Sequence, residues 1–566
     1  MEVRRRIVVV GGTAAGPKAA AKARRMDQHA EITIVQREPD LSMATCGYPY
    51  YVGGSFDDRN LLLAAPTGAL RDPKFFLDVK GIKALVNTEV EAVDPVAHTV
   101  LCNNLLTGEM TTHPYDKLVL ATGASAVVPP IPGINLKGIT TLQSMRDTDY
   151  LRQVRDAKAA KKAVVVGGGL IGIEVAEALR LSGIEVTVVE MMPQILAFLD
   201  WEIAKLVENH MRAKGVHVAT GDRVAEFLGA GERLTAVRLQ RGVEMPCDLA
   251  VVAVGVQPNV ELAVAIGLEV GDCGGICVNE YLQTSEPDIY AAGDCIEVTH
   301  LITGKKVLAP FGDLANLQGR VAGQNVIAGN KVTFPGTIQT GVCKVFDFTV
   351  GSTGLSEASA RRNGYDRIVS MVTAGPDKPH YMKGRLLVVK MVAHAETGHV
   401  LGVQCVGAGD ASKRIAAAAM AIQGKLTVGD LGNADLPYAP PFSPPIDNLI
   451  VAAHCLENKM LGRVHTISST EFKRKLDAKE GLFVLDVRGP DEYEAMRLGV
   501  GEKLIPLGTL RKRVNELPRD KGKEIVCYCK ISVRAYEAAT FLTANGWTNV
   551  RVLEGGLSAW PFEREK

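Results

Sequence analysis

The chain has few aromatic residues, almost no net charge and no long apolar run. Aromatic residues make up 5% of its 566 residues, the formal net charge is +1, and glycines number 57. A charge so close to zero gives no support for a nucleic-acid partner at whole-chain level. No apolar run approaches the roughly 20 residues that a membrane-spanning helix needs, so no membrane partner is expected. Scarce aromatics with abundant glycine are typical of α/β domains.

The chain also lacks a regular cysteine pattern. Its 11 cysteines are scattered, whereas disulfide frameworks belong to small secreted chains. Cys273 with Cys277, and Cys527 with Cys529, do not have the spacing of common zinc sites, and no metal is expected. We therefore expect a cytoplasmic protein with mostly buried, reduced thiols. Its length suggests about three or four domains.

One nucleotide-binding pattern occurs twice, and the second copy is complete. Residues 163–190 read AVVVGGGLIGIEVAEALRLSGIEVTVVE, in which Gly167, Gly169 and Gly172 occupy the three glycine positions. Such glycines let the backbone approach a pyrophosphate at a helix N-terminus. Glu190 ends the second strand, where a carboxylate can bind the adenine-ribose hydroxyls and repel a 2′-phosphate. The pattern therefore predicts NADH in preference to NADPH.

The first copy, residues 6–38, is degenerate. Gly11 is followed by Thr13 at the place of the middle glycine and then by Gly16, and Gln36 occupies the usual acidic position. Two further stretches strengthen the interpretation: YDKLVLATG, residues 115–123, and TSEPDIYAAGD, residues 284–294. Each is a short buried strand, the first ending in a small-residue turn and the second on Asp294.

These paired units, with the ATG turn and the TSEPDIYAAGD segment, resemble the pyridine nucleotide-disulfide oxidoreductases. The resemblance implies that the first unit holds FAD and the second NADH, with Asp294 at the ribityl or phosphate region and residues 308–312 near the flavin ring. An amide at Gln36 can still hydrogen-bond hydroxyl groups. The cofactor-binding residues expected on this basis are Gly11, Thr13, Ala14, Ala15, Gln36, Arg37, Ala121, Thr122, Gly123, Asp294 and Pro310 for FAD, and Gly167, Gly169, Ile171, Gly172, Glu190 and Gly255 for NADH.

The same resemblance divides the chain into an α/β arrangement of several domains and predicts a homodimer. The proline-dense stretch LPYAPPFSPP, residues 436–445, predicts no regular secondary structure. The expected parts are a first portion of the FAD domain at 1–150, the NAD(H) domain at 151–275, a second portion of the FAD domain at 276–329, a dimerisation domain at 330–456, a linker at 457–466 and a last domain at 467–566.

The last domain carries its own motifs. Cys529 follows the strand EIVCY and precedes an alanine-rich helix, so it faces backbone N–H groups and a positive helix end that stabilise an anion on sulfur. Cys527 alternates to the other side of the strand and is expected to be buried. With LDVRGPDEYE and LEGGLSAW, the domain resembles a rhodanese. Four residues separate Cys529 from Arg534, as in sulfur-handling loops, although Ser532 replaces the usual glycine.

Cys46 lies in the segment SMATCGYPYY, and the next cysteine along the chain is Cys102. A free cysteine is most often a small apolar residue in a turn. A redox role instead requires a partner sulfur brought in from outside, or a sulfenic acid. The glutathione-reductase-like pair of cysteines is absent, and Ala14 replaces the histidine of the peroxidase and oxidase branch. The segment resembles the single-cysteine coenzyme A-disulfide reductases, although Thr45 departs from their usual asparagine.

That resemblance adds coenzyme A as a ligand. Lys18, Lys22, Arg24 and Arg25 share one early helix and could bind its phosphates, or they could form a solvated helix face. Substrate-binding positions are expected at Lys22, Arg25 and Ser42. Tyr381 and Tyr438 match tyrosines that relatives contribute from the opposite subunit. A thiolate at Cys46, favoured by the flavin and the following helix, would need no separate general base.

Together these patterns predict an NADH-dependent persulfide or polysulfide reductase. Cys529, assisted by Arg534, takes up sulfane sulfur, Cys46 attacks the persulfide and releases hydrosulfide, and FADH₂ reduces the resulting disulfide. The alternatives are a coenzyme A-disulfide reductase with an independent sulfurtransferase, a NADH oxidase, and a redox sensor without turnover. Which sulfur compound is the natural substrate stays open.

Overall fold

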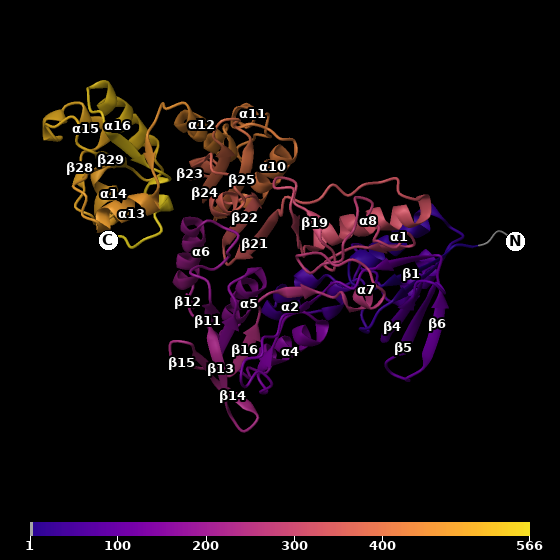
Figure 1. Ribbon diagram of the computed structural model, residues 1–566. Helices are drawn as coiled ribbons and strands as arrows, with labels where there is room; N and C mark the ends of the chain where they lie inside the picture. Colours follow the sequence, from indigo (N-terminus) through magenta and orange to yellow (C-terminus); the bar gives the residue numbers. More distant parts are fainter. Residues whose placement is uncertain (1–3) are drawn as a thin grey trace. The chain divides into compact units, whose positions relative to one another are not determined.

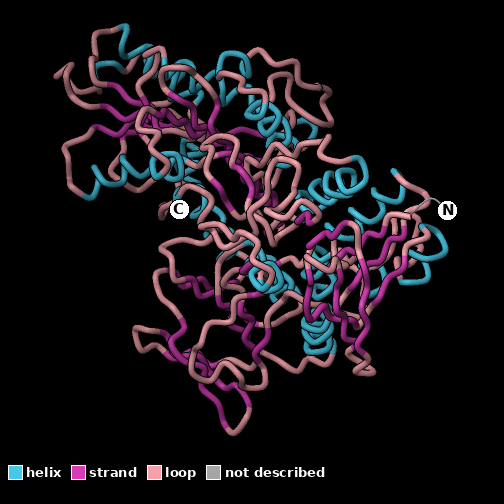
Figure 2. Tube along the Cα trace, turned by 45° about the vertical axis from the view of Figure 1, so that its right-hand side comes forward, coloured by secondary structure: helices cyan, strands magenta, loops and turns pink. Residues whose placement is uncertain are grey.

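The computed structural model of the chain describes residues 4–566. These residues form two compact units, one made of residues up to 191 with 221–337, the other of 192–220 with 338–566. In both units strands and helices alternate along the chain (Figures 1 and 2). The predicted α/β class is confirmed.

The first unit contains a parallel sheet with the strand order β18-β7-β1-β2-β3. Its strands are β1 (Arg6–Val10), β2 (Glu31–Val35), β3 (Lys83–Leu85), β7 (Lys117–Leu120) and β18 (Ile289–Ala291). Two helices, α1 (Ala15–Met26) and α8 (Gly312–Ala328), pack closely against each other. Segments far apart in the sequence therefore complete one dinucleotide-binding fold.

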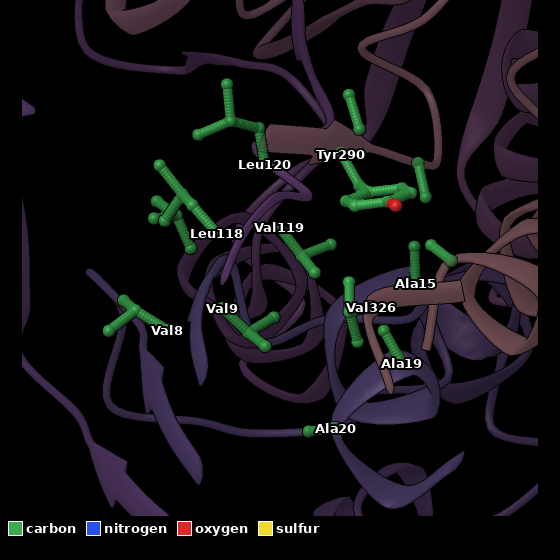
Figure 3. Packing of buried hydrophobic residues seen from close by; sticks show 14 of the residues in the cluster. Val8, Val9, Ala15, Ala19, Ala20, Leu118, Val119, Leu120, Tyr290 and Val326 are labelled. Carbon is green, nitrogen blue, oxygen red and sulfur yellow. The ribbon is translucent and has the colours of Figure 1, made fainter. Parts of the chain in front are cut away.

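Alternation along the strands places this unit's core. Val9 and Val119 are fully buried, and Figure 3 shows them on the side of the sheet where Ala15, Ala19 and Val326 lie. Successive strand residues point to opposite faces, so neighbours of Val9 and Val119 pack on the other side. Because α1 is rich in alanine, α8 approaches it closely: a Cβ on Gly319 would lie 2.3 Å from the Ala15 carbonyl oxygen.

A second parallel arrangement in this unit has the strand order β11-β10-β16-β9. Its elements are β9 (Ile139–Thr140), α4 (Met145–Asp156), β10 (Lys162–Val166), α5 (Leu170–Leu181), β11 (Glu185–Glu190) and β16 (Leu249–Val252). The remaining elements of the unit form small antiparallel sheets and short helices: α2 (Tyr48–Gly53), α3 (Pro73–Lys80), β4 (Thr88–Asp94), β5 (Thr99–Asn104), β6 (Met110–Pro114), β8 (Ala124–Ala126), β13 (Val224–Ala230), β14 (Arg233–Leu239), β15 (Glu244–Pro246), β17 (Val256–Pro258), α7 (Glu261–Ala265), β19 (Val298–Thr299) and β20 (Lys306–Val307).

The second unit begins with an antiparallel sheet in the order β21-β22-β25-β24-β23. Its elements are α6 (Trp201–Ala213), β12 (Val216–Thr220), β21 (Gly341–Val345), β22 (Phe348–Gly354), α9 (Glu357–Arg362), β23 (Ile368–Pro376), β24 (Leu386–His394), β25 (Val400–Gly407), α10 (Ala411–Gln423), α11 (Val428–Gly432) and α12 (Asn448–Met460). Residues 436–445 form no helix or strand, as predicted. Because α12 ends at Met460, the predicted linker 457–466 begins inside a helix.

A parallel sheet in the order β26-β30-β29-β27-β28 ends the second unit. Its elements are β26 (Thr466–Ile467), α13 (Ser469–Asp477), β27 (Phe483–Asp486), α14 (Pro490–Ala495), β28 (Lys503–Leu504), α15 (Leu507–Leu510), β29 (Ile525–Tyr528), α16 (Val533–Ala544) and β30 (Val550–Leu553). Cys527 is fully buried on β29, as expected from the strand alternation.

Within residues 4–566, no helix is both long and apolar enough to cross a membrane. The same residues contain no group of three or more His, Cys, Asp or Glu side chains that could hold a metal ion.

Candidate active site: two nucleotide turns and two cysteines

The two glycine turns of the first unit repeat the same close backbone contacts. A Cβ on Gly11 would lie 2.0 Å from the Ala121 carbonyl oxygen, and one on Gly16 would lie 1.9 Å from the Gly11 carbonyl oxygen. At Gly167 and Gly172 the corresponding separations are 2.2 Å and 2.0 Å. Only glycine fits at such positions, and the turn thus brings the helix N-terminus against the strand ends, where a pyrophosphate would lie.

The middle position of the turn explains how Thr13 is accommodated. A Cβ added at Gly169, its counterpart in the second copy, meets nothing within 4 Å. A side chain at this position therefore points into open space, and the degenerate first copy keeps the geometry of the complete one. Ala14 precedes α1, which begins at Ala15, and Ile171 lies exposed in the first turn of α5.

Gln36 stabilises the first turn. Its buried side chain accepts a hydrogen bond from the Gly12 N–H at 2.8 Å and donates one to the Asp40 carbonyl at 3.3 Å. Glu190 holds the second turn in the same way, accepting from the Gly168 N–H at 2.7 Å. In each copy, the residue expected to bind ribose, Gln36 or Glu190, thus also fixes the turn. Arg37, next to Gln36, is exposed and pairs with Glu38 and Glu89.

The other expected FAD positions gather at the carboxyl ends of β7 and β18. Thr122 bonds to Asn259 through both its hydroxyl and its carbonyl, and Gly123 follows with a φ of +67°. Asp294 comes directly after the Ala-Ala-Gly turn of β18, and burial raises the pKa of its carboxyl to about 6. A half-buried carboxyl with no hydrogen-bond partner among the described residues fits a cofactor hydroxyl. Pro310 is exposed.

Gly255 lies in a loop of the second nucleotide-binding domain. Its φ is +122°, and its carbonyl accepts a hydrogen bond from the Val127 N–H at 2.9 Å. It therefore connects β16 to the antiparallel pair β17 and β8.

Cys46 lies in a 3₁₀ turn at Thr45–Gly47, before α2, and is solvent-accessible. The N-terminus of α8 lies next to its sulfur, since a Cβ on Gly312 would be 3.6 Å from Cys46 Sγ. Packing around the sulfur and the carboxylate of Glu174 nevertheless raise the pKa of the thiol, with smaller contributions from Asp294 and Asp313. The chain's own groups therefore oppose ionisation of Cys46, and a thiolate favoured by the flavin stays a prediction.

Glu174 is a residue that sequence reasoning missed. It lies on α5, and the Tyr50 hydroxyl, four residues after Cys46, donates to its carboxylate at 3.4 Å. Burial raises the pKa of Glu174 to about 7. The only signal in the sequence was a pair of acids, Glu174 and Glu177, inside the otherwise apolar segment LIGIEVAEAL.

Basic residues of α1 form a cluster with a lysine from another helix. Burial, followed by the charges of Arg25 and Lys18, lowers the pKa of Lys80 at the end of α3. Lys18, Lys22, Arg25 and Lys80 have no acidic partner among residues 4–566, which favours an anionic ligand over a merely solvated face. Lys80 was missed from the sequence. Arg24 does not join this cluster, since it donates to carbonyl groups, among them those of Lys80 and Gly81.

The remaining substrate positions expected from the sequence are dispersed. Ser42 has a φ of +53°, and its N–H donates to the Gly12 carbonyl at 2.7 Å, so it follows the first nucleotide turn. Tyr381 lies in a 3₁₀ turn at His380–Met382 of the second unit and is 70% exposed. Tyr438 lies in the proline-dense stretch and is 49% exposed.

The Cys529 loop occupies the space between β29 and α16. Cys529 is fully buried, and the Arg534 guanidinium binds Glu492 with two hydrogen bonds, at 2.7 and 2.8 Å. These bonds, and a further one to Cys529, raise the pKa of Arg534. Arg534 also lowers the pKa of Glu492 to about 2. The loop thus places the Arg534 guanidinium next to the sulfur of Cys529. The ionised carboxylate of Glu492 binds this guanidinium.

Ser532 adopts the conformation that glycine would otherwise supply. Its φ is +74°, in the left-handed region, and its hydroxyl donates to the Leu553 carbonyl at 2.7 Å. This hydrogen bond offsets the cost of a side chain in that region. The departure from the usual glycine therefore leaves the loop conformation intact.

The segment 554–558 lies against the Cys529 loop and is hydrogen-bonded to it. The N–H groups of Leu557 and Ser558 donate to the carbonyls of Cys529 and Lys530, each at 2.9 Å. The buried carboxylate of Glu554 accepts hydrogen bonds from the Val372 N–H of β23, from Lys459 of α12 and from Thr466. One segment therefore holds both the loop and the contact with the antiparallel sheet of the same unit.

Comparisons with known proteins agree with this architecture. Residues 5–309 match the model of the pyridine nucleotide-disulphide oxidoreductases, residues 340–450 match the dimerisation domain of that family, and residues 468–562 match the rhodanese-like domain. The chain belongs to the pyridine nucleotide-disulphide oxidoreductase family. The predicted resemblance is confirmed, and the family depends on FAD and NAD(P)H.

Individual relatives cover most or all of the chain. A NAD-dependent persulfide reductase from A. fulgidus is 41% identical, with a TM-score of 0.93 over 98% of this chain and 100% of that one. The reduced Bacillus anthracis CoADR-RHD is 35% identical, with a TM-score of 0.91 over 99% of this chain and 98% of that one. The NAD(P)H coenzyme A polysulfide/persulfide reductase of Pyrococcus horikoshii is 36% identical over 80% of this chain and 99% of its own length.

Replacing Gln36 with leucine tests the role of the turn. Gln36→Leu leaves the buried Gly12 N–H without an acceptor, so we expect the free energy of unfolding to fall by about 1–3 kcal/mol. Flavin content after gel filtration should fall as well. Thermal unfolding and flavin absorbance per mole of protein measure both effects. Glu31→Gln, at an exposed position of β2, is the control, and equal values for the two variants would contradict this role of Gln36.

Replacing Glu174 with glutamine tests the electrostatics at Cys46. Glu174 is ionised above pH 7, where its charge disfavours the Cys46 thiolate, so Glu174→Gln should lower the pKa of the thiol. The alkylation rate of Cys46 by iodoacetamide, measured against pH in the reduced protein, should reach its half-maximum at a lower pH than in the wild type. A profile shifted upward, or not at all, would show that Glu174 does not act on the sulfur.

Two substitutions at Ser532 separate its hydroxyl from its backbone conformation. Ser532→Ala keeps the strained φ but loses the bond to Leu553, and we expect the sulfurtransferase rate of Cys529 to fall severalfold. Ser532→Gly should retain most of that rate, because glycine adopts the left-handed region without strain. The rate of thiocyanate formation from a persulfide donor and cyanide measures both variants. A glycine variant as slow as the alanine variant would refute this explanation.

Proposed function

We propose that this chain is an NADH-dependent reductase of persulfides or polysulfides, with coenzyme A as carrier or ligand and a rhodanese domain for sulfur uptake. The observation that carries the proposal is that one chain combines Cys46, which has no neighbouring cysteine, with Cys529 in the loop between β29 and α16. Cys46 is accessible in the unit with both nucleotide turns, and the next cysteine, Cys102, is buried. Cys529 lies in a loop that places the Arg534 guanidinium beside its sulfur. Three relatives named for the reduction of persulfide, of polysulfide or of sulfur with coenzyme A support this proposal.

The chemistry at Cys46 follows from its isolation. Its thiolate attacks the inner sulfur of a persulfide R–S–SH, forming a mixed disulfide with R and releasing HS⁻. Bound FAD and NADH would supply the two electrons that cleave this disulfide to two thiols. The N-terminus of α8 favours the thiolate, whereas Glu174, with a pKa of about 7, lies where it can hold or release a proton.

The chemistry at Cys529 precedes that at Cys46. Its thiolate accepts sulfane sulfur, and Arg534 with the surrounding N–H groups stabilises the resulting Cys–S–S⁻ anion. The basic cluster of Lys18, Lys22, Arg25 and Lys80 would bind the phosphates of coenzyme A. The dimerisation domain supports a homodimer, in which Tyr438 and Tyr381 would act from the opposite subunit, and we place the protein in the cytoplasm.

A steady-state comparison tests the proposal. NADH oxidation should be faster with coenzyme A persulfide than with coenzyme A disulfide, and Cys46→Ser should abolish both activities. Cys529→Ser should retain turnover of coenzyme A persulfide but lose turnover of donors that need uptake by the rhodanese domain. Faster reduction of coenzyme A disulfide would instead identify a disulfide reductase with an independent sulfurtransferase.

Two controls distinguish the remaining alternatives. A NADH oxidase, as the relatives from Methanocaldococcus jannaschii and Enterococcus faecalis are named, predicts oxygen-dependent turnover that survives Cys529→Ser. A redox sensor predicts bound FAD with negligible NADH oxidation on any sulfur compound. Anaerobic and aerobic assays of the same preparation separate both from the reductase.

A further inference from the structure

The rhodanese loop carries a charge arrangement that bears on its sulfur donor. Cys529 is fully buried, whereas the side chains of Arg534 and Glu492, which pair beside it, are 36% and 37% exposed, so a donor from solvent approaches the sulfur beside this pair. Arg534 offers both sides of its fork to the carboxylate of Glu492. With a pKa of about 2, Glu492 keeps its negative charge at every working pH. In the form of the site that reacts, in which Cys529 is a thiolate, the sulfur, the Arg534 guanidinium and the Glu492 carboxylate together carry one net negative charge.

Two other groups near the loop do not compensate for this charge. Arg488 is buried and held by Asp486 through three hydrogen bonds of 2.6–3.0 Å. The Ser532 hydroxyl, which could bind an oxyanion, is engaged with the Leu553 carbonyl. Lys530 is exposed and has no carboxylate partner among residues 4–566, so its ammonium offsets part of the charge, reduced by solvent screening.

An exposed apolar side chain also lies next to the loop, at the start of α16. Val533 follows Ser532 directly and is 60% exposed, at the first position of α16. Val533 is exposed, and both terminal nitrogens of the neighbouring Arg534 already donate to Glu492. This environment suits a donor that is uncharged in the part next to its sulfur. It does not suit a donor that carries a sulfonate there.

We infer that Glu492 is a specificity-determining residue, which selects monoanionic organic persulfides as sulfur donors to Cys529 and disfavours the dianion thiosulfate. With a persulfide, Cys529–S⁻ and R–S–S⁻ give Cys529–S–S⁻ and RS⁻. With thiosulfate, Cys529–S⁻ and S₂O₃²⁻ give Cys529–S–S⁻ and SO₃²⁻. The second reaction brings two negative charges toward a site that is already negative. This inference rests on the proposed sulfur uptake by Cys529 but not on the reductase reaction.

The test measures sulfur transfer to cyanide, without NADH, in the full-length protein. Cyanide converts Cys529–S–S⁻ to Cys529–S⁻ and thiocyanate, and the donors are 2-hydroxyethyl persulfide and thiosulfate. Glu492→Gln should raise kcat/KM roughly tenfold for the dianion thiosulfate but only about threefold for the monoanionic persulfide, because the repulsion that the variant removes scales with the charge of the donor. Glu471→Gln removes the same charge from the same domain, where it pairs with Arg551, and should change neither.

The salt dependence of the wild type gives a second measurement that needs no variant. Repulsion between like charges predicts that kcat/KM for thiosulfate rises with ionic strength. A fall with ionic strength would mean that a free cation attracts this donor, and it would overturn the inference. An unchanged thiosulfate rate in Glu492→Gln would overturn it as well. Neither result would affect the reductase proposal, which fails only if NADH oxidation does not depend on Cys46.

Discussion

The contact between each glycine turn and the strand beside it determines where every nucleotide-facing group of the first unit lies. A Cβ on Gly16 or Gly172 would lie within about 2 Å of the carbonyl oxygen of Gly11 or Gly167, so α1 and α5 can approach their strands only because these residues are glycine. Gln36 then fixes the first turn by accepting a hydrogen bond from the Gly12 N–H, and Glu190 fixes the second by accepting one from the Gly168 N–H. An amide and a carboxylate serve equally well here, because both offer the oxygen that the N–H requires.

A second constraint governs the other unit. The buried carboxylate of Glu554 accepts hydrogen bonds from β23, α12 and the start of the rhodanese domain, while the residues just after it support the Cys529 loop. The loss of any one of these hydrogen bonds would leave a buried carboxylate incompletely paired and would lower the free energy of unfolding. We therefore expect the three contacts to form together. The position of Cys529 relative to the antiparallel sheet is therefore set by packing rather than by a flexible connection. This explains why α12 continues to Met460, into the segment expected to be a linker.

The sequence predicted the fold, both nucleotide turns and both cysteines, because each depends on local patterns: glycine spacing, strand alternation and a cysteine at a strand end. It did not predict Glu174 or Lys80, whose roles arise from contacts between α5, α2, α1 and α3 that no local pattern reports. It also left open the effect of Ser532, because its hydroxyl partner, Leu553, lies 21 residues away. The carboxylates that raise the pKa of Cys46 were missed for the same reason, since they come from distant segments.

The two cysteines are thereby placed in opposite electrostatic environments. At Cys529 the Arg534 guanidinium lies beside the sulfur, whereas at Cys46 packing around the sulfur and three carboxyl groups raise the pKa of the thiol. In the proposed reaction a sulfane sulfur on Cys529 would be an anionic persulfide, because a persulfide is a better acid than a thiol. Cys46, by contrast, would become a nucleophile only after it loses its proton, and Glu174, whose pKa is about 7, acts electrostatically on that thiol and is suited to receive a proton. Proton transfer would therefore be required for the attack of Cys46.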